Sequence, residues 1–303
     1  MRNRQYTPPT VTPTPTITPT PTKTSTPTET PFPAQLTDAH GVTLQLIPAG
    51  SFEMGGLHFE ALFHCVAIDE EWNEEPCGED WYLEEPIHTV TLDAFYMDTY
   101  EVTIGQFKQC MEDGGCEKPE IPDYFDEFDR PEFETHPMVF IKWAEAKNFC
   151  EWRGVRLPTE AEWEKAARGP ENWKFTWGDA WGTPADGAFA NFCDSQCAEP
   201  HRNLDYNDGY AQTAPVGSYP PNPYGLYDML GNVWEWVSDF WDARYYEVSP
   251  EVNPLGPDAG FYRVVRGGSW VNISSNIRNT NRYYRNPDYF YWGTGFRCAM
   301  DLP

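Results

Sequence analysis

The chain has 303 residues, of which 40% are hydrophobic, and a formal net charge of −26. Nucleic-acid binding requires a basic surface and anionic membranes repel an acidic one, so the charge argues against both kinds of partner. No run of about 18 apolar residues occurs, so the sequence also predicts no direct membrane insertion. The acidity fits calcium binding or solubility outside the cell. The alternative is that the charge only keeps the protein soluble.

The 8 cysteines are even in number, and several lie close together in the chain. No C-x-x-C motif occurs, which argues against a zinc ribbon or a thioredoxin-like site. Short-range pairs beside turn residues favour disulfides formed in an oxidising compartment. We therefore predict an extracellular or cell-surface location, although the first residues, MRNRQYTPPT, include no apolar segment typical of a signal peptide. The pairs expected from proximity are Cys65–Cys77, Cys110–Cys116 and Cys193–Cys197.

Residues 7–33 form a Thr-Pro repeat. Proline fixes φ and removes a backbone donor, so this repeat cannot build a core and favours an extended, polyproline-II-like chain. The pattern predicts a stalk over residues 1–34 that presents a single domain over residues 35–303. The alternative is a plain disordered tail.

Strands and helices can be placed in the first half of the predicted domain. Residues 42–56 and 88–103 contain alternating apolar and polar residues and predict strands, with an acidic, irregular insertion at 57–86 between them. Thr103 with Gln106, and Thr159 with Glu162, have the spacing of capping boxes and predict two helix starts. Another helix is predicted over residues 141–152.

Helical periodicity disappears after Gly169, and residues 170–260 are rich in Gly, Asn, Asp and Trp. The segments 261–270 and 293–302 read as closing strands. The predicted class is therefore α+β, with few helices, short antiparallel strands and much ordered coil. Because so much coil needs support beyond a hydrophobic core, metals and disulfides are the expected stabilisers.

Four strings resemble the formylglycine-generating-enzyme, or sulfatase-modifying factor, family. They appear in the order of that family and span nearly everything after the stalk. The resemblance implies a C-type-lectin-like fold. The strings are IPAGSFEMGG at 47–56, RLPTEAEWEKAARG at 156–169, NPYGLYDMLGNVWEWVSDFW at 222–241, and RVVRGGSWV with GFRCA between 263 and 299.

The segment GLYDMLGNVWEW has the chemistry of a cation site. Asp228 and Glu235 supply hard carboxylate oxygens, and a turn at Gly231 lets backbone carbonyls bend inward, a mixture that calcium prefers. The alternative is that both carboxylates are helix caps or surface groups. The resemblance implies two calcium sites that use both side chains and backbone oxygens. The matching positions are Asp228, Gly231, Val233 and Glu235 for the first site, and Asn191, Phe192, Asp208 and Tyr210 for the second.

The resemblance also bears on long-range disulfides. Cys150 and Cys298 match a family disulfide that joins the second helix to the last strand. A second long-range disulfide of the family oxidase falls here on Ala167 and Arg282, so both of its cysteines are absent.

The family oxidase holds copper(I) with two thiolates that follow its GGS motif, and it converts a substrate cysteine to formylglycine. Copper(I) requires such soft ligands. Counted from Gly267-Gly268-Ser269, the two positions are Asn272 and Ile277, and no cysteine lies between Cys197 and Cys298. No copper is therefore expected, which favours a protein that is not an enzyme. The 6 histidines form no H-x-x-x-H-x-E motif of the kind that iron-dependent relatives carry.

Residues 271–294 occupy the place of the family's substrate groove and are dense in Asn, Tyr, Ser, Thr and Arg. Tyrosine offers rigid amphipathic contact area, and Asn and Ser offer adaptable hydrogen bonds. We expect this tract to bind a protein, peptide or glycan. The alternative is a fixed loop that packs polar residues over the groove. The candidate contact residues are Asn272, Asn276, Tyr283, Tyr284, Tyr289, Tyr291 and Trp292.

The frame of this tract, RGGSW…R…NR…NPD…GFR, also resembles the variable region of retroelement-diversified lectin-fold proteins. The sequence thus favours a calcium-stabilised, surface-displayed binding protein, in which the tract either varies or is fixed. Two other functions stay open. One is an oxidoreductase of the same family that acts on a peptide or peptide-derived substrate without the cysteine pair, and the other is a structural component of the cell surface.

Overall fold

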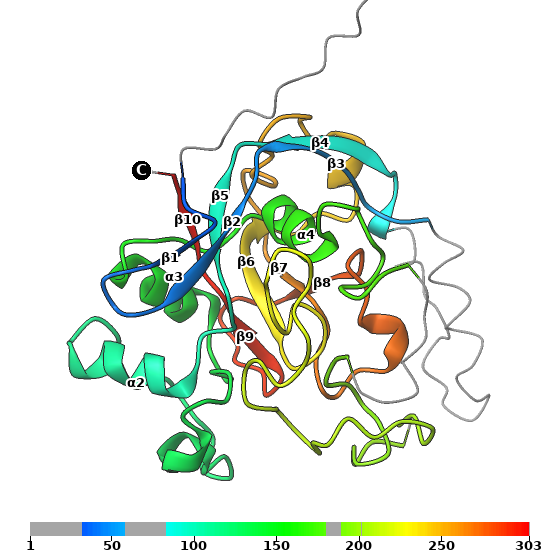
Figure 1. Cartoon of the computed structure of the whole chain (residues 1–303). Helices are drawn as coiled ribbons and strands as arrows, with labels where there is room; N and C mark the ends of the chain where they lie inside the picture. The colour runs from blue at the N-terminus through cyan, green and yellow to red at the C-terminus, as the bar shows by residue number, and fades with distance from the viewer. Residues whose placement is uncertain (1–31, 58–82, 180–188, 201, 303) are drawn as a thin grey trace, which may run out of the picture. The chain divides into compact units, whose positions relative to one another are not determined.

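The computed structural model describes residues 32–57, 83–179, 189–200 and 202–302 (Figure 1). The chain divides into Met1–Phe32 and Pro33–Pro303, and the described residues lie almost wholly in the second unit. Residues 1–31 of the predicted stalk and most of the acidic insertion therefore fall outside the described residues, as does the predicted pair Cys65–Cys77.

Both predicted capping boxes are confirmed. Helix α2 (Ile104–Glu112) begins after Thr103, whose hydroxyl accepts the Gln106 N–H at 3.2 Å while the Gln106 side chain accepts the Thr103 N–H at 2.9 Å. Helix α4 (Glu160–Arg168) begins in the same way, with Thr159 and Glu162 bonded at 3.1 and 2.8 Å. Each box satisfies amide donors that the first helical turn leaves unpaired.

Helix α3 (Trp143–Trp152) begins two residues later than predicted. The carbonyl of Ile141 accepts the indole N–H of Trp236 at 2.9 Å, so this residue anchors the chain just before the helix. The Glu145 side chain then accepts the Lys142 N–H at 2.7 Å and satisfies a donor at the helix start.

The strands form three sheets, and most of the pairing is antiparallel. The first has the order β1-β2-β5-β10 and the second pairs β3 with β4. The third has the order β8-β7-β6-β9, in which only the β6–β9 pair is parallel. The strands are β1 (Gln35–Thr37), β2 (Thr43–Ile47), β3 (Gly50–Met54), β4 (His88–Leu92), β5 (Phe95–Asp98), β6 (Trp234–Phe240), β7 (Arg263–Arg266), β8 (Arg282–Arg285), β9 (Thr294–Phe296) and β10 (Ala299–Asp301).

The sheet β8-β7-β6-β9 separates two hydrophobic cores. Successive strand residues face opposite sides, so Val237 and Val264 pack with Trp163 of α4 while Trp236 and Val265 pack with α2 and α3. Figure 1 shows α4 near the centre of the domain, with α2 and α3 to its left. The three helices of the described residues, together with short strands and long coil, confirm the α+β class.

The six cysteines of the described residues are all paired. Cys110–Cys116 and Cys193–Cys197 confirm the pairs expected from proximity. Cys150–Cys298 joins α3 to the chain between β9 and β10 across 148 residues, which confirms the pair implied by the resemblance.

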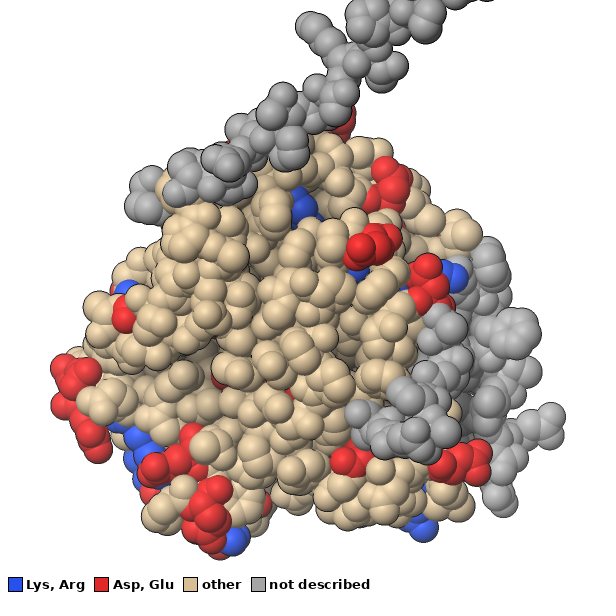
Figure 2. Space-filling model, in the orientation of Figure 1, with Lys and Arg blue, Asp and Glu red and all other residues tan. Residues whose placement is uncertain are grey.

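Charged side chains are scattered over the one face of the molecule that Figure 2 shows. On the face shown in Figure 2, uncharged side chains fill the centre, and acidic side chains lie toward the rim with a few basic ones among them. In the described part of the chain, no helix has the length and apolar character needed to cross a bilayer.

Candidate functional site

The turn after β7 holds the two residues that match the copper-binding cysteines of the family oxidase. Gly267 and Gly268 adopt φ of +97° and +78°, the left-handed region that glycine tolerates. Asn272 Oδ1 then accepts hydrogen bonds from Ser269 N at 3.0 Å and Ser269 Oγ at 2.7 Å. Ile277 is 1% exposed and packs in the core on the α4 side of the sheet. Asn272 therefore closes a local turn and Ile277 is a core residue, and neither supplies a soft ligand.

The predicted contact residues differ in exposure. The side chains of Tyr283, Tyr289 and Trp292 are 44%, 62% and 44% exposed. The other four are half-buried: Asn272, Asn276, Tyr284 and Tyr291.

Four aromatic side chains form a continuous surface that we call the aromatic strip, made of Trp241, Tyr262, Tyr283 and Tyr284. The rings of Tyr283 and Tyr284 are stacked with centroids 5.2 Å apart. The Tyr284 ring lies 4.9 Å from Trp241 and 5.0 Å from Tyr262. The sequence did not predict Trp241 and Tyr262 as contact residues, because the pairing of β6 with β7 and of β7 with β8 is needed to bring them to Tyr284. The one available signal was the Phe261-Tyr262 pair before β7, and Phe261 is 91% exposed.

The remaining predicted aromatics lie in the loop between β8 and β9. The Trp292 ring meets Trp270 edge-on at 4.9 Å, which fixes its orientation. The Arg285 guanidinium lies 4.2 Å from the Tyr291 ring and 5.7 Å from the Tyr283 ring, so it links this loop to the aromatic strip. The structure thus links Tyr291 to Tyr283 and Tyr284 through Arg285 and the stacked tyrosine rings.

The first predicted cation position has an acceptor without a donor. Asp228 is buried, and its Oδ2 accepts the Gly217 N–H at 2.6 Å, whereas its Oδ1 has no hydrogen-bond partner among the described residues. Burial raises the pKa of Asp228 to about 6. The pKa of buried Glu101 is raised well above its usual value by burial and then by Asp228 and Glu235. A cation between these acids would relieve their repulsion.

Glu235 is already engaged. Its two oxygens accept the Arg297 guanidinium at 2.7 and 2.8 Å, and the Trp163 indole N–H at 2.8 Å. A calcium ion bound by Glu235 would therefore share the carboxylate with Arg297. Within the described ranges, no three His, Cys, Asp or Glu side chains are placed to hold a metal together, so such a site would depend on amide and backbone oxygens.

The second predicted position adjoins the first. Asn191 donates to Asn232 Oδ1 at 3.1 Å and to Gln212 O at 2.7 Å, while its own Oδ1 is buried and without a partner in the described part of the chain. A Cβ at Gly231 would lie 2.2 Å from Asn191 O, so only glycine fits where the two positions meet.

Asp208 accepts backbone N–H groups at this second position. The N–H of Phe192 donates to Oδ2 at 2.9 Å and that of Tyr210 donates to Oδ1 at 3.0 Å. Burial raises the pKa of Asp208 to about 6. Asp208 thus binds the residue that follows Asn191 in the chain, namely Phe192. Among the described residues, no hydrogen bond joins Asn191 to Asp208 directly.

An ion pair joins the two elements that carry the positions of the family's second long-range disulfide. Ala167 is buried in α4, and Arg282 of β8 is 2% exposed. Arg282 donates from Nε and Nη2 to the two carboxylate oxygens of Glu160, both at 2.8 Å. The same two elements, α4 and β8, are thus joined by a bidentate pair, the geometry that suits a guanidinium and a carboxylate.

The model of the sulfatase-modifying factor enzyme 1-like domain matches residues 30–302. The formylglycine-generating enzyme of Thermomonospora curvata is 33% identical over 303 residues, covering 84% of this chain and 92% of that protein. The serine/threonine-protein kinase pkn1 of Chlamydia pneumoniae is 37% identical over 238 residues, or 72% of this chain. The match spans only 35% of that kinase.

Two solved structures share the fold. PvdO from Pseudomonas aeruginosa superposes with a TM-score of 0.66 and 27% identity, covering 88% of this chain and 98% of PvdO. Treponema denticola variable protein 1 superposes with a TM-score of 0.63 and 23% identity, covering 89% of this chain and 100% of the Treponema chain.

Proposed function

Because this chain belongs to the family of sulfatase-modifying factor enzyme 1-like domains but has Asn272 and Ile277 in place of the two copper-binding thiols, we propose that it is a ligand-binding protein and not the copper oxidase. The observation that carries the proposal is the packing of Ile277, which is 1% exposed, in the core. The disulfides support a location outside the cell or on its surface.

The proposed ligand contacts the aromatic strip and the loop with Tyr289, Tyr291 and Trp292. The four rings of the aromatic strip contact one another and Trp292 contacts Trp270, so these rings offer contact area without a large loss of side-chain entropy on binding. Arg285 supplies a charged group beside Tyr283 and Tyr291. A protein, peptide or glycan is the class of ligand that such a surface suits.

The fold shared with the Treponema variable protein supports a version of this proposal in which residues 271–294 vary between copies of the gene. Sequencing codons 271–294 across isolates distinguishes a diversified surface from a fixed one. Changes confined to these codons mean diversification, and a uniform sequence leaves a fixed ligand surface or the enzyme without the cysteine pair.

The second candidate is an oxidoreductase that acts on a peptide without the cysteine pair. It is favoured by relatives that are named formylglycine-generating enzymes, one of which this chain matches over 92% of its length. A purely structural role at the cell surface is the remaining alternative, and it requires that no ligand bind to the aromatic strip.

We expect no aldehyde when the full chain is incubated with a Cys-x-Pro-x-Arg peptide, oxygen and copper, because the chain supplies no thiolate at positions 272 and 277. Mass spectrometry of the peptide checks this, with an active family oxidase as the positive control. Formylglycine in the product would overturn the binding proposal in favour of the enzyme.

We also propose that calcium stabilises the domain at one or both predicted positions. The support is that each position holds a buried side-chain oxygen without a donor among the described residues, Asp228 Oδ1 and Asn191 Oδ1. These oxygens, with nearby backbone carbonyls, form the mixture that calcium accepts. When bound, the ion would supply positive charge among the buried carboxylates of Asp228, Glu101 and Glu235.

Chelation with EGTA is expected to lower the melting temperature, since an ion that binds only the folded state stabilises it by mass action. At a calcium concentration of about 100 Kd the loss is about 2.7 kcal/mol. Asp228→Ala should remove this sensitivity at the first position, while Asp258→Ala, at an exposed carboxylate, should keep it. An identical melting temperature with and without chelator would contradict both sites.

A further inference from the structure

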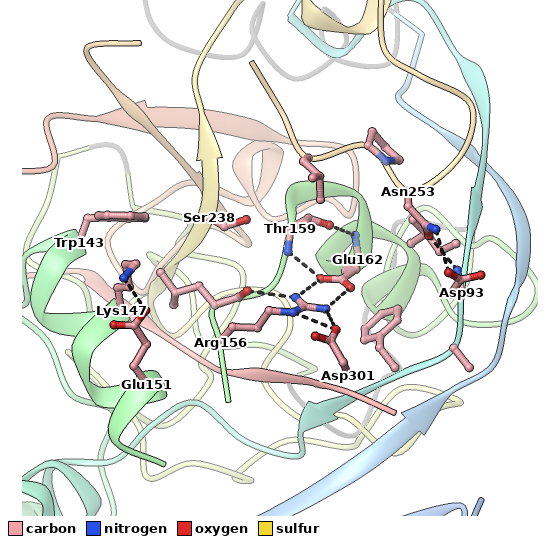
Figure 3. Close-up of a pocket in the computed structure, with 16 residues that line it drawn as sticks. Asp93, Trp143, Lys147, Glu151, Arg156, Thr159, Glu162, Ser238, Asn253 and Asp301 are labelled. Atoms are coloured by element: carbon pink, nitrogen blue, oxygen red, sulfur yellow. Dashed lines mark hydrogen bonds and ion pairs between the residues drawn. The ribbon is translucent and has the colours of Figure 1, made fainter. Parts of the chain in front are cut away.

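A pocket of about 550 Å³ opens between α3, the start of α4 and β10 (Figure 3). Its volume is in the range of about 300–1,000 Å³ that is usual for small-ligand sites. No residue of the tract 271–294 lines it, so it is distinct from the proposed ligand surface. Its walls are partly apolar, with contributions from Leu92, Phe95, Trp143, Leu157 and Leu255.

The positive groups of the pocket are already neutralised. Arg156 donates to both oxygens of Glu162 at 2.7 Å and, through Nε, to Asp301 at 3.0 Å. Lys147 is paired with Glu151 one helical turn away. An anionic ligand would have to compete with these carboxylates for Arg156 and Lys147.

The helix N-terminus at the pocket is also satisfied. The Thr159 N–H donates to Glu162, and the Glu162 N–H donates to the Thr159 hydroxyl. The Glu160 N–H donates to Asp239 at 2.9 Å. The start of α4 therefore has few donors left to receive an anion, although helix N-termini often bind one.

Negatively charged side chains outnumber positively charged ones in the lining of the pocket. The lining carries four carboxylates (Asp93, Glu151, Glu162 and Asp301) and two cations (Lys147 and Arg156), so its formal charge is 2 − 4 = −2. The side chains of Glu151 and Asp301 are 54% and 75% exposed. Neither Glu151 Oε2 nor Asp301 Oδ2 accepts a hydrogen bond from the described residues. In Figure 3, Glu151 lies beside Lys147 at the end with Trp143, Asp301 and Glu162 lie beside Arg156 in the middle, and Asp93 lies with Asn253 at the other end.

The indole ring of Trp143 already contacts one cation of this chain. The Arg263 guanidinium lies 3.7 Å from the ring centroid, a cation–π contact. The indole N–H donates to Val237 O at 2.8 Å, so the ring is held in place where it lines the pocket.

From the cavity, the saturated donors, the carboxylate excess and the apolar walls together, we propose that this pocket binds an organic cation with an apolar stem. An alkylguanidinium or alkylammonium group fits, either as a free molecule or as the side chain of an Arg or Lys in a polypeptide. The cationic group pairs with the free oxygen of Glu151 or of Asp301, and the stem lies against Trp143 and Leu255.

Isothermal titration calorimetry of the full chain with butylguanidinium, and separately with a blocked Gly-Arg-Gly peptide, tests the proposal. We expect saturable binding of at least one probe that weakens as salt is raised. The double variant Glu151→Gln/Asp301→Asn should weaken binding about tenfold. The matched control Glu112→Gln/Asp258→Asn changes two exposed carboxylates outside the pocket and should bind as the unchanged protein does.

Leu255→Ser tests the apolar half, since this side chain is 73% exposed at the rim and its loss should not affect folding. We expect about threefold weaker binding from the lost apolar contact.

Binding of the peptide alone identifies a polypeptide side chain as the ligand, and equal binding of both probes identifies the free cation as sufficient. Binding of neither probe, or undiminished binding by the double variant, would overturn the proposal. Tyr283→Ala should leave this binding unchanged, so the result is independent of the aromatic strip.

Discussion

Arg282→Ala is expected to lower the free energy of unfolding by about 3–5 kcal/mol, because it would leave the carboxylate of Glu160 buried without its main partner. Glu160 is 2% exposed, and its next guanidinium contact, Arg266 Nη1, is weaker at 3.4 Å. The variant also loses the hydrogen bond from Arg282 Nη1 to Leu83 O at 2.9 Å and the cation–π contact with Tyr246 at 4.0 Å. Urea unfolding followed by circular dichroism measures the change.

Arg285→Ala is the matched control for this experiment. Arg285 lies on the same strand, but the structure gives it no ion pair among the described residues, so its loss should cost about 1 kcal/mol. The double variant Glu160→Gln/Arg282→Met should recover much of the stability, since it removes both charges and fills similar volume. A loss below about 1 kcal/mol for Arg282→Ala would mean that water reaches Glu160 and that the pair does not replace the disulfide.

Replacing Cys150 and Cys298 together with alanine is expected to cost about 5 kcal/mol in the chain-entropy model, because the disulfide closes 148 residues. Both residues are fully buried beside Phe149 and Phe296, so the packing of α3 against β9 also loses two sulfur atoms. Denaturant unfolding at equal protein concentration measures the loss.

The pair Cys193 and Cys197 provides the comparison, since it closes only 4 residues and the same model gives about 2 kcal/mol for its removal. Equal losses for the two double variants would show that loop closure is not what makes the long-range disulfide stabilising. Mass spectrometry of each variant without reducing agent confirms which disulfide has been removed.

The sequence by itself determined the features whose interactions are local or are repeated in a family. The two capping boxes at Thr103 and Thr159 join residues three apart, so the amino acids at those positions were enough to place the helix starts. The short disulfides were likewise readable from spacing. The four family strings predicted the fold and, through the resemblance, the pair Cys150–Cys298.

Long-range geometry decided the rest. Glu160 and Arg282 are 122 residues apart and Arg156 and Asp301 are 145 apart, so neither pair leaves a local trace in the sequence. The aromatic strip forms only when the β7–β8 register sets Val264 opposite Tyr284. The role of Ile277 also depends on its burial. The sequence shows that position 277 is not a cysteine, and only its packing with residues of α4 shows that it is a core residue. A side chain's role follows from its neighbours, and these come together only when the strands pair and the helices pack.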